Sequence, residues 1–143
     1  MQSNADLTRR WFKEVWNEQR EETIDELFAA DGIAHGLADG QRQLPGPQAF
    51  REFWNKFRQA FPDIKIKIED VISEGDKTVV RFFFKATHLG DGLGLPPTNK
   101  KVKGTGITIT RWKNGKLIEG WNEFDVMGLM QQLGAAPAKS VRA

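Results

Sequence analysis

Apolar residues recur at helical spacing in two segments near the start of the chain. The first segment, residues 7–16, carries one apolar stripe made of Leu7, Trp11, Phe12, Val15 and Trp16. Ser3 or Asn4 is suited to cap this helix, because short polar side chains accept hydrogen bonds from the first free backbone N–H groups. A second, shorter helix is predicted over about 22–28, ending at Asp31-Gly32.

The clearest helical pattern follows a predicted loop over residues 33–45. Gly46-Pro47 opens this helix, because proline is tolerated in a first turn, and Pro62 ends it. Its apolar face is continuous and contains Phe50, Phe53, Trp54, Phe57 and Phe61. Such a stripe indicates a packed core rather than a cofactor site.

Beyond Pro62 the period of the apolar positions becomes that of strands. Charged residues alternate there with Ile64, Ile66 and Ile68. Three further strands are predicted over residues 78–88, 101–112 and 117–125. Asn114-Gly115, between the last two strands, is the preferred pair for a two-residue hairpin turn. Residues 89–99 are predicted to form a loop, and a last helix is predicted over 126–133.

This order of elements predicts an α+β fold in which helices cover one face of a curved, mainly antiparallel sheet. The 143 residues are an ordinary length for one domain. We expect a single domain over 1–143, with a core over about 5–134 and a flexible tail over 135–143.

Composition narrows the chemistry that the chain can perform. Cysteine and tyrosine are absent, which excludes disulfides, thiolates and phenols, whereas ten phenylalanines and five tryptophans supply apolar surface for a core or a ligand cavity. The net charge of +2 comes from basic and acidic residues that are mixed along the chain, without the clustering of a nucleic-acid-binding surface. No apolar run is long enough for a membrane helix or a secretory signal, so we expect no membrane association and a cytoplasmic location.

The predicted hairpin gathers acidic side chains on one face of the sheet. With Asn114-Gly115 as the two loop residues, Thr108 lies opposite Trp121. That face then carries Gly104, Gly106, Thr108, Glu119, Trp121, Glu123 and Asp125. Carboxylates opposite glycines suit a cavity in which an acid or base approaches a substrate. In the alternative interpretation this face is in water and Asp125 only caps the last helix.

The only imidazoles, His35 and His88, lie where regular structure gives way to a loop, which is a common position for binding groups. His88 continues the apolar row of the 78–88 strand, which favours a place at the rim of whatever that face encloses. The alternative is a surface histidine or a buried one with satisfied hydrogen bonds. The two residues lack the spacing of metal ligands, so no metal site is expected.

Five strings follow one another over roughly residues 7–134, namely RRWFKEVWNEQ, IDELFAADGIAHG, GPQAFREFWNKFRQAFPDIKIKIEDVISEGDKTVVRF, THLGDGLGLPPTNKKV and GTGITITRWKNGKLIEGWNEFDVMGLMQQLG. Together they resemble the SnoaL-like polyketide cyclase family, within the nuclear transport factor 2-like superfamily. The resemblance implies a cone-shaped α+β barrel with an apolar pocket closed by helices, no cofactor, and an intramolecular aldol ring closure in aromatic polyketides.

The resemblance also assigns residues. It implies that Asp125 is the general acid/base, that Trp121 is a pocket tryptophan, and that His35 matches a histidine that follows the second helix. A carboxylate in an apolar cavity has a raised pKa, which suits it to move a proton next to a carbonyl. The remaining candidate substrate-binding residues are His88, Glu123, Trp54 and Thr108.

Two positions depart from the family pattern. Gly120 stands where the last strand often has a histidine, and Glu123 stands where an apolar residue is usual. If Glu123 and Asp125 both face inward, they titrate as a coupled pair in which one member is held protonated.

Three functions are compatible with these residues. The first is a cofactor-independent cyclase, isomerase or lyase that acts on a small hydrophobic carbonyl compound, with Asp125 as the acid/base. The second is a noncatalytic module for hydrophobic-ligand binding or dimerisation. The third is epoxide or ester hydrolysis by a water held by carboxylates and Arg111, which the predicted register opposes because Arg111 and Asp125 lie on opposite faces unless the register slips by one residue.

A homodimer is expected, because a sheet covered by helices on one face exposes the other face. If the carboxylates face inward, the residues available for this contact are Ile107, Ile109, Ile118 and Phe124.

Overall fold

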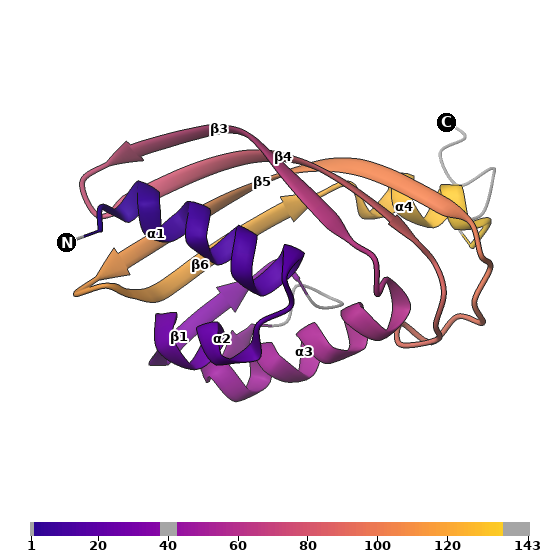
Figure 1. Ribbon diagram of the computed structural model, residues 1–143, viewed down its shortest axis with the longest axis horizontal. Coiled ribbons are helices and arrows are strands. Elements are labelled where there is room, and N and C mark those ends of the chain that lie inside the picture. Colours follow the sequence, from indigo (N-terminus) through magenta and orange to yellow (C-terminus); the bar gives the residue numbers. More distant parts are fainter. Residues whose placement is uncertain (1, 38–42, 136–143) are drawn as a thin grey trace.

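A computed structural model describes residues 2–37 and 43–135 (Figure 1). The helical elements are α1 (Asn4–Trp11), the π-helical segment η1 (Phe12–Asn17), α2 (Glu21–Leu27), α3 (Gly46–Ala60) and α4 (Val126–Leu133). The strands are β1 (Phe28–His35), β2 (Leu44–Pro45), β3 (Lys65–Glu74), β4 (Lys77–Thr87), β5 (Lys101–Lys113) and β6 (Lys116–Phe124).

The six strands form one curved sheet in the order β2-β1-β6-β5-β4-β3. Neighbouring strands are antiparallel except for β1 and β6, which are parallel. Figure 1 shows α1, α2 and α3 on one side of this sheet and α4 at its far end. The predicted α+β architecture is therefore confirmed, with a sheet that curves over the helices and stays open at its two edge strands.

Helix ends follow the capping rules that the sequence suggested. Ser3 Oγ accepts from the Asp6 backbone N–H, and the Asp6 carboxylate accepts from the Ser3 backbone N–H, so α1 begins with a capping box. The last helix has the predicted bounds, and Gly134 ends it with φ of 75°, a left-handed conformation that glycine adopts without strain. Most of the predicted tail, residues 136–143, lies outside the described residues.

Strand β1 was not predicted. The sequence indicates a helix to about residue 28 and a loop from 33, whereas α2 ends at Leu27 and Phe28 is already extended. Ala, Asp and Gly in this segment have low strand propensity, so local preference gives no signal. Parallel pairing with the distant strand β6 holds the segment extended, with an interruption between Phe28 and Ile33. Residues 38–42 of the predicted loop are not described.

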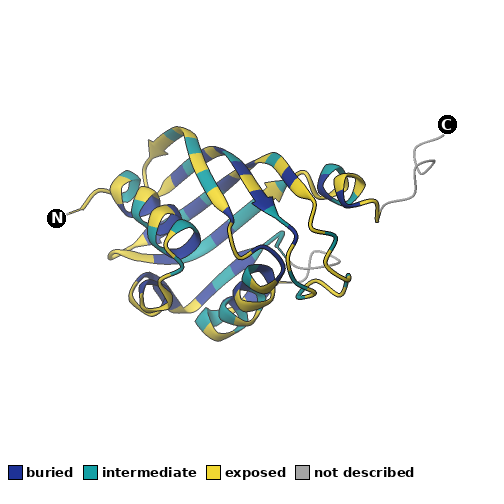
Figure 2. Cartoon of the chain, turned by 45° about the vertical axis from the view of Figure 1, so that its right-hand side comes forward, coloured by how far each residue is buried: buried dark blue, intermediate teal, exposed yellow. Residues whose placement is uncertain are grey.

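Aromatic side chains dominate the core between the helices and the sheet. Figure 2 shows buried and exposed residues alternating along the strands, as expected for a sheet with one covered face. Both predicted helical stripes face this core. The most deeply buried aromatic residues are Phe12, Phe28, Phe50, Trp54, Phe61, Phe84 and Trp112.

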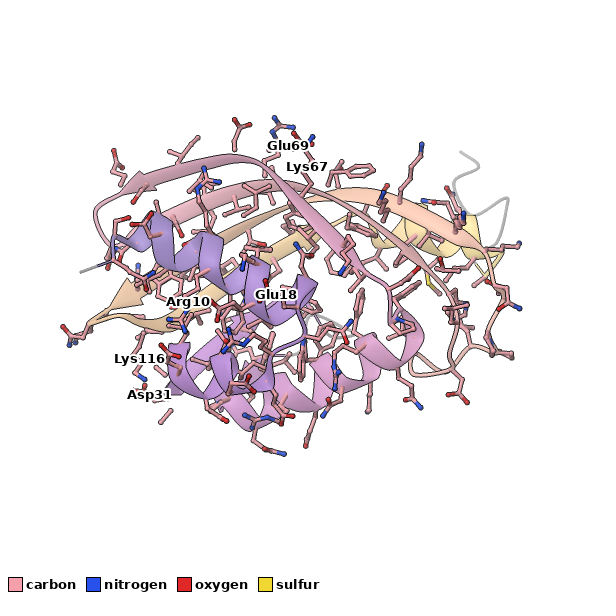
Figure 3. All side chains as sticks on the ribbon, viewed as in Figure 1. Arg10, Glu18, Asp31, Lys67, Glu69 and Lys116 are labelled. Atoms are coloured by element: carbon pink, nitrogen blue, oxygen red, sulfur yellow. The ribbon has the colours of Figure 1, made fainter. Side chains whose placement is uncertain are left out.

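A polar network ties α1 and η1 to α2. Arg10, labelled in Figure 3, donates to Glu14 at 2.9 Å and to both carboxylate oxygens of Glu26 at 2.7 and 2.6 Å. Thr23 Oγ1 donates to Glu14 at 2.7 Å. Burial raises the pKa of Glu14, but the hydrogen bonds from Thr23 and Arg10 outweigh burial and hold that pKa below its ordinary value.

Candidate active site

An apolar pocket lies between the helices and the inner face of the sheet. Its cavity volume is about 70 Å³, and the space between all its lining atoms, with the solvent at its open mouth included, is about 770 Å³. Ten of the nineteen lining residues are aromatic, and they come from α1, η1, α3, β1, β4 and β6. The polar side chains of this lining are those of Thr108, Thr110 and Asn122. Within the described part of the chain, the lining thus contains no titratable side chain.

Asn122 is held in one orientation at the junction of β1, β5 and β6. Its Nδ2 donates to the backbone carbonyl of His35 at 2.8 Å, and its Oδ1 accepts from Thr108 Oγ1 at 3.0 Å. Because a backbone carbonyl only accepts, the amide nitrogen must face His35 and the amide oxygen must face Thr108. The polar part of this otherwise apolar wall therefore consists of the remaining amide hydrogen of Asn122 and the hydroxyl groups of Thr108 and Thr110.

A β-bulge in β6 determines which side chains reach the pocket. The predicted turn at Asn114-Gly115 is present, and Leu117 pairs with Trp112. The next paired residue of β6 is Glu119, so Ile118 is an extra residue in the strand. Since side chains alternate between the two faces of a sheet, one extra residue moves every later side chain of β6 to the other face.

The predicted register of the hairpin was wrong by one residue. Thr108 pairs with Asn122 and not with Trp121. As a result, Asn122 and Phe124 line the pocket, whereas Trp121 and Glu123 lie on the outer face of the sheet. The prediction that the carboxylate of Glu123 faces inward beside that of Asp125 is wrong for this reason, as is the outward placement of Phe124.

Asp125 caps α4, which is the alternative that the sequence left open. Its Oδ1 accepts from the Gly128 backbone N–H at 2.8 Å, and its side chain is exposed. The buried apolar setting expected for this carboxylate is therefore wrong. Asp125 does directly follow Phe124, which lines the pocket, so its backbone lies at the border of the lining.

His35, Trp121 and Glu119 form a cluster on the outer face. His35 Nε2 lies 2.7 Å from Glu119 Oε2, and the His35 ring stacks on Trp121 with 5.7 Å between ring centroids and 13° between planes. Arg111 approaches Glu119 at 3.9 Å. The bulge places Trp121 on the outer face, and His35 lies there because its neighbour Ala34 faces the pocket, so these two predicted binding residues are outside the pocket lining.

The remaining candidates lie in the core. Thr108 lines the pocket, whereas Trp54 is fully buried beside it and donates Nε1–H to the Val15 carbonyl at 3.1 Å. His88 is fully buried against Phe61, with Nδ1 accepting from the Thr98 N–H at 3.2 Å, and its Nε2 has no partner among the described residues. His88 is not part of the pocket lining.

Two glycines of β5 give the pocket its depth. Gly104 and Gly106 lie opposite Phe84 and Phe82, whose rings lie over them. A Cβ added at Gly104 would lie 2.7 Å from the Phe84 ring, and one at Gly106 would lie 2.4 Å from the Phe82 ring. Without Cβ atoms at these two positions, the two phenylalanine rings can lie flat against the sheet. Because both phenylalanines line the pocket, the flat rings leave the pocket deeper.

The sequence patterns gave no indication that Asn122 lines the pocket. A signal for the bulge was available, because the predicted register turns several carboxylates toward an apolar core, and burying unpaired charge is costly. The shifted register turns Gly120, Asn122 and Phe124 inward instead, and Phe124 and Asn122 are far less costly to bury than glutamates.

The described residues contain no group of three or more His, Asp or Glu side chains arranged to hold a metal ion. In the same part of the chain, no helix is both long and apolar enough to cross a membrane.

Comparison with known proteins agrees with this architecture. The family model of the SnoaL-like polyketide cyclase matches residues 6–133. The chain is 26% identical over 136 residues to the aklanonic acid methyl ester cyclase of Streptomyces peucetius, covering 94% of this chain and 92% of that protein. The curated relatives are named cyclases, which supports a cyclase-like enzyme.

Solved structures of similar proteins have the same fold. A SnoaL-like polyketide cyclase from Jannaschia sp. CCS1 superimposes with a TM-score of 0.84 at 22% identity, covering 96% of this chain and 99% of that one. A polyketide cyclase from Acidithiobacillus ferrooxidans superimposes with a TM-score of 0.78 at 29% identity, with the same coverage. From the family match over nearly its whole length, the chain belongs to the SnoaL-like polyketide cyclase family.

Proposed function

We propose that the protein is a cofactor-independent cyclase that closes a ring in a small, largely apolar carbonyl compound inside the aromatic pocket. The observation that carries this proposal is the pocket lining, in which ten of nineteen residues are aromatic and three are polar but neutral. Aromatic walls bury the flat face of a ring system and exclude water from it. Relatives named as cyclases of aklanonic and nogalonic acid methyl esters support an aromatic ester as the substrate class.

The polarity of the lining favours a neutral substrate. A carboxylate moved into the pocket would lose its hydration without gaining a cationic partner from the described lining residues, which is unfavourable. An ester or ketone loses much less hydration free energy, and one or two hydrogen bonds to its carbonyl oxygen can replace the lost water. We therefore expect an ester to bind more tightly than the corresponding free acid.

An aldol ring closure needs a base and a hydrogen-bond donor. The base removes a proton from a carbon next to a carbonyl, that carbon bonds to a second carbonyl carbon, and the second carbonyl oxygen takes up a proton. No electrons are gained or lost overall, so the balance needs no cofactor. One Nδ2 hydrogen of Asn122 goes to the His35 carbonyl, and the other donates to the substrate carbonyl oxygen.

Asp125 is the proposed acid/base of this reaction. Two observations support this role: the carboxylate is accessible, and Oδ1 accepts the Gly128 N–H while Oδ2 is left to exchange a proton with substrate at the pocket border. The wall residue Phe124 is its immediate neighbour in the chain.

Noncatalytic binding of a hydrophobic ligand is the second candidate. The observation that favours it is the lack of any titratable side chain in the described pocket lining. The hydrolase alternative has less support, because Arg111 pairs with Asp76 and Glu119 on the outer face, away from the pocket.

The test follows turnover of aklanonic acid methyl ester by chromatography, because the cyclised product has the same mass as the substrate. Asn caps helices as well as Asp does, so Asp125→Asn removes the base but keeps the cap. We expect this variant to fold normally and to lose at least ~10²-fold in rate. Turnover of Asp125→Asn at the wild-type rate would exclude Asp125 as the acid/base. Saturable binding by the wild-type protein without any conversion would identify the noncatalytic function.

A further inference from the structure

A second hollow, with a volume of about 480 Å³, lies at the end of β4 and β5 that α4 approaches (Figure 1). Its charged lining residues are Lys85 of β4, Lys101 and Lys103 of β5, and Asp63, which precedes β3. Phe84 lines the aromatic pocket, and neighbouring residues of a strand face opposite sides of the sheet. Lys85 therefore lies on the side of the sheet away from that pocket. We call this hollow the lysine groove.

Sheet pairing brings together three lysines that lie in two separate segments of the sequence. Lys85 is paired directly with Lys103, and Lys101 is two residues before Lys103 on the same face of β5. Directly paired side chains begin about 5 Å apart, and side chains two residues apart on one strand begin about 7 Å apart. Because lysine side chains are long and flexible, the three ammonium groups can converge on one anion.

The three lysines repel one another without a compensating contact. Within residues 2–37 and 43–135, none of their ammonium groups makes an ion pair or a hydrogen bond with another side chain. Lys85 is also paired with Lys65, whose Nζ donates to the Asn17 carbonyl at 3.0 Å. Like charges directly opposite each other destabilise a sheet, and local arrangements that cost stability are typical of functional sites. An anion bound between the lysines would relieve this repulsion.

Helix α4 closes one side of the lysine groove. Strand β6 ends at Phe124, so residues 101–105 of β5 have no paired residue in β6. Gln132 of α4 takes the place of the missing strand. Its Oε1 accepts from the Lys103 backbone N–H at 2.9 Å, and its Nε2 donates to the Lys103 carbonyl at 2.8 Å. These two hydrogen bonds fix the backbone that carries Lys103.

Asp63 lies at the other side of the groove and leaves the β5 side to an anion. Its carboxylate accepts from the backbone N–H and the hydroxyl of Thr87, both at 2.7 Å. Burial raises the pKa of Asp63, but these hydrogen bonds and the charge of Lys101 hold that pKa below its ordinary value. Strand β4 stands between Asp63 and β5, where Thr87 pairs with Lys101. Three lysines and one aspartate give the groove a net positive charge.

We propose that the lysine groove binds the phosphate group of a small anionic ligand, either a soluble phosphate ester or a lipid headgroup. A phosphate monoester carries a charge of about −1.5 to −2 at neutral pH. Lysine pairs with it as a point charge, whereas a carboxylate is matched best by the planar fork of arginine. The described lining of the groove contains three lysines and no arginine. The proposal stands apart from the proposed function, because the groove and the aromatic pocket lie on opposite sides of the sheet.

Inorganic pyrophosphate is the probe, and its binding is measured by isothermal titration calorimetry at low ionic strength, where exposed charges are least screened. The wild-type protein is expected to bind it saturably. Lys85→Gln should weaken this binding at least ~10-fold, because it removes one of three charged hydrogen-bond donors. Lys113→Gln is the matched control, since Lys113 is also paired directly with a lysine, Lys116, but lies at the far end of β5. This control should change the affinity less than ~2-fold.

Thermal unfolding separates the loss of a site from the loss of the fold. Without the anion, Lys85→Gln should raise Tm by ~1–4 °C, because it relieves two pairs of like charges. Pyrophosphate should raise the Tm of the wild-type protein and leave that of Lys85→Gln almost unchanged. A Tm of Lys85→Gln below the wild-type value would contradict the repulsion that argues for a bound anion.

Vesicles identify the source of the phosphate group. Co-sedimentation with phosphatidylcholine vesicles that contain phosphatidic acid, lost in Lys85→Gln, would assign the site to a lipid headgroup. Binding of pyrophosphate without binding of these vesicles would assign it to a soluble ester, and both results support the proposal. A wild-type protein that does not bind pyrophosphate, an equal loss of affinity in Lys85→Gln and Lys113→Gln, or tighter binding of an acidic hexaglutamate peptide than of pyrophosphate would each overturn it.

Discussion

Gly106→Ala is the substitution whose effect follows most directly from the geometry of the pocket. The new Cβ would lie 2.4 Å from the Phe82 ring and 2.9 Å from Phe124 Cβ, whereas ordinary contacts begin near 3.4 Å. The Phe82 ring must therefore move by about 1 Å, and no positive φ prevents alanine from adopting the backbone conformation. Because Phe82 and Phe124 both line the pocket, the substitution changes the shape of the pocket from behind its wall.

The expected loss of stability combines two opposing effects. Overpacking a core costs ~1–3 kcal/mol, and replacing glycine by alanine in a strand returns ~0.5–1 kcal/mol through the entropy of the unfolded chain. The net free energy of unfolding should fall by ~0.5–2 kcal/mol. An unfolding entropy of ~2.1 cal/mol/K per residue over this length converts that loss to a decrease of ~2–7 °C in Tm.

Thermal unfolding and ligand titration check this prediction together. Tryptophan fluorescence can follow the binding of acetophenone, 2-acetylnaphthalene and 2-acetylanthracene, which carry one, two and three fused rings. Gly106→Ala should weaken the largest ketone most, and Phe82→Leu in the same chain should restore part of both the Tm and the affinity, because it removes the crowded ring atoms. An unchanged Tm with an unchanged size preference would refute this account of the pocket wall.

Three further predictions follow from the described contacts. Asp125→Ala removes the α4 cap and should lower the free energy of unfolding by ~1 kcal/mol in thermal unfolding, whereas Asp125→Asn should not. Asn122→Ala leaves the Thr108 hydroxyl without its acceptor and should weaken ketone binding in the fluorescence titration. Glu14→Gln should destabilise the protein most above about pH 4.5, as measured by denaturant titrations at several pH values. The reason is that the Glu14 carboxylate has a lowered pKa in the folded state, so it stabilises the fold above its unfolded pKa. That contribution is lost as the pH falls through the folded pKa.

Local patterns were sufficient for the helices and for most of the sheet. Periodicity and capping act over a few residues, and they predict the apolar stripes of the first and third helices, the turn at Asn114-Gly115 and the bounds of α4. Strand β1 could not be predicted in this way, because its Ala, Asp and Gly residues favour no strand. Pairing with β6, far along the chain, decides its conformation.

The prediction of the candidate site from the sequence failed because the register of the β5–β6 hairpin shifts by one residue. A hairpin turn determines which residues pair only as far as the first irregularity, and here the irregularity comes at Ile118, three residues beyond the turn. Every assignment on β6 beyond that point changed face, including Trp121 and Glu123. Thr108 kept its predicted inward position because β5 has no extra residue between it and its partners on β4.

Filling the pocket from Gly120 tests the central claim that the aromatic pocket is the reaction site. Gly120 lines the pocket, and a Cβ placed there would meet only the Ile109 carbonyl at 3.9 Å, so the Cβ of Gly120→Leu fits without strain and the rest of the side chain extends into the pocket. Thr105→Leu adds apolar bulk on the exposed face of β5 as its control. We predict that Gly120→Leu keeps the wild-type Tm within a few degrees and loses at least ~10-fold in kcat/KM, while the control keeps both. Wild-type kcat/KM in Gly120→Leu would contradict the claim.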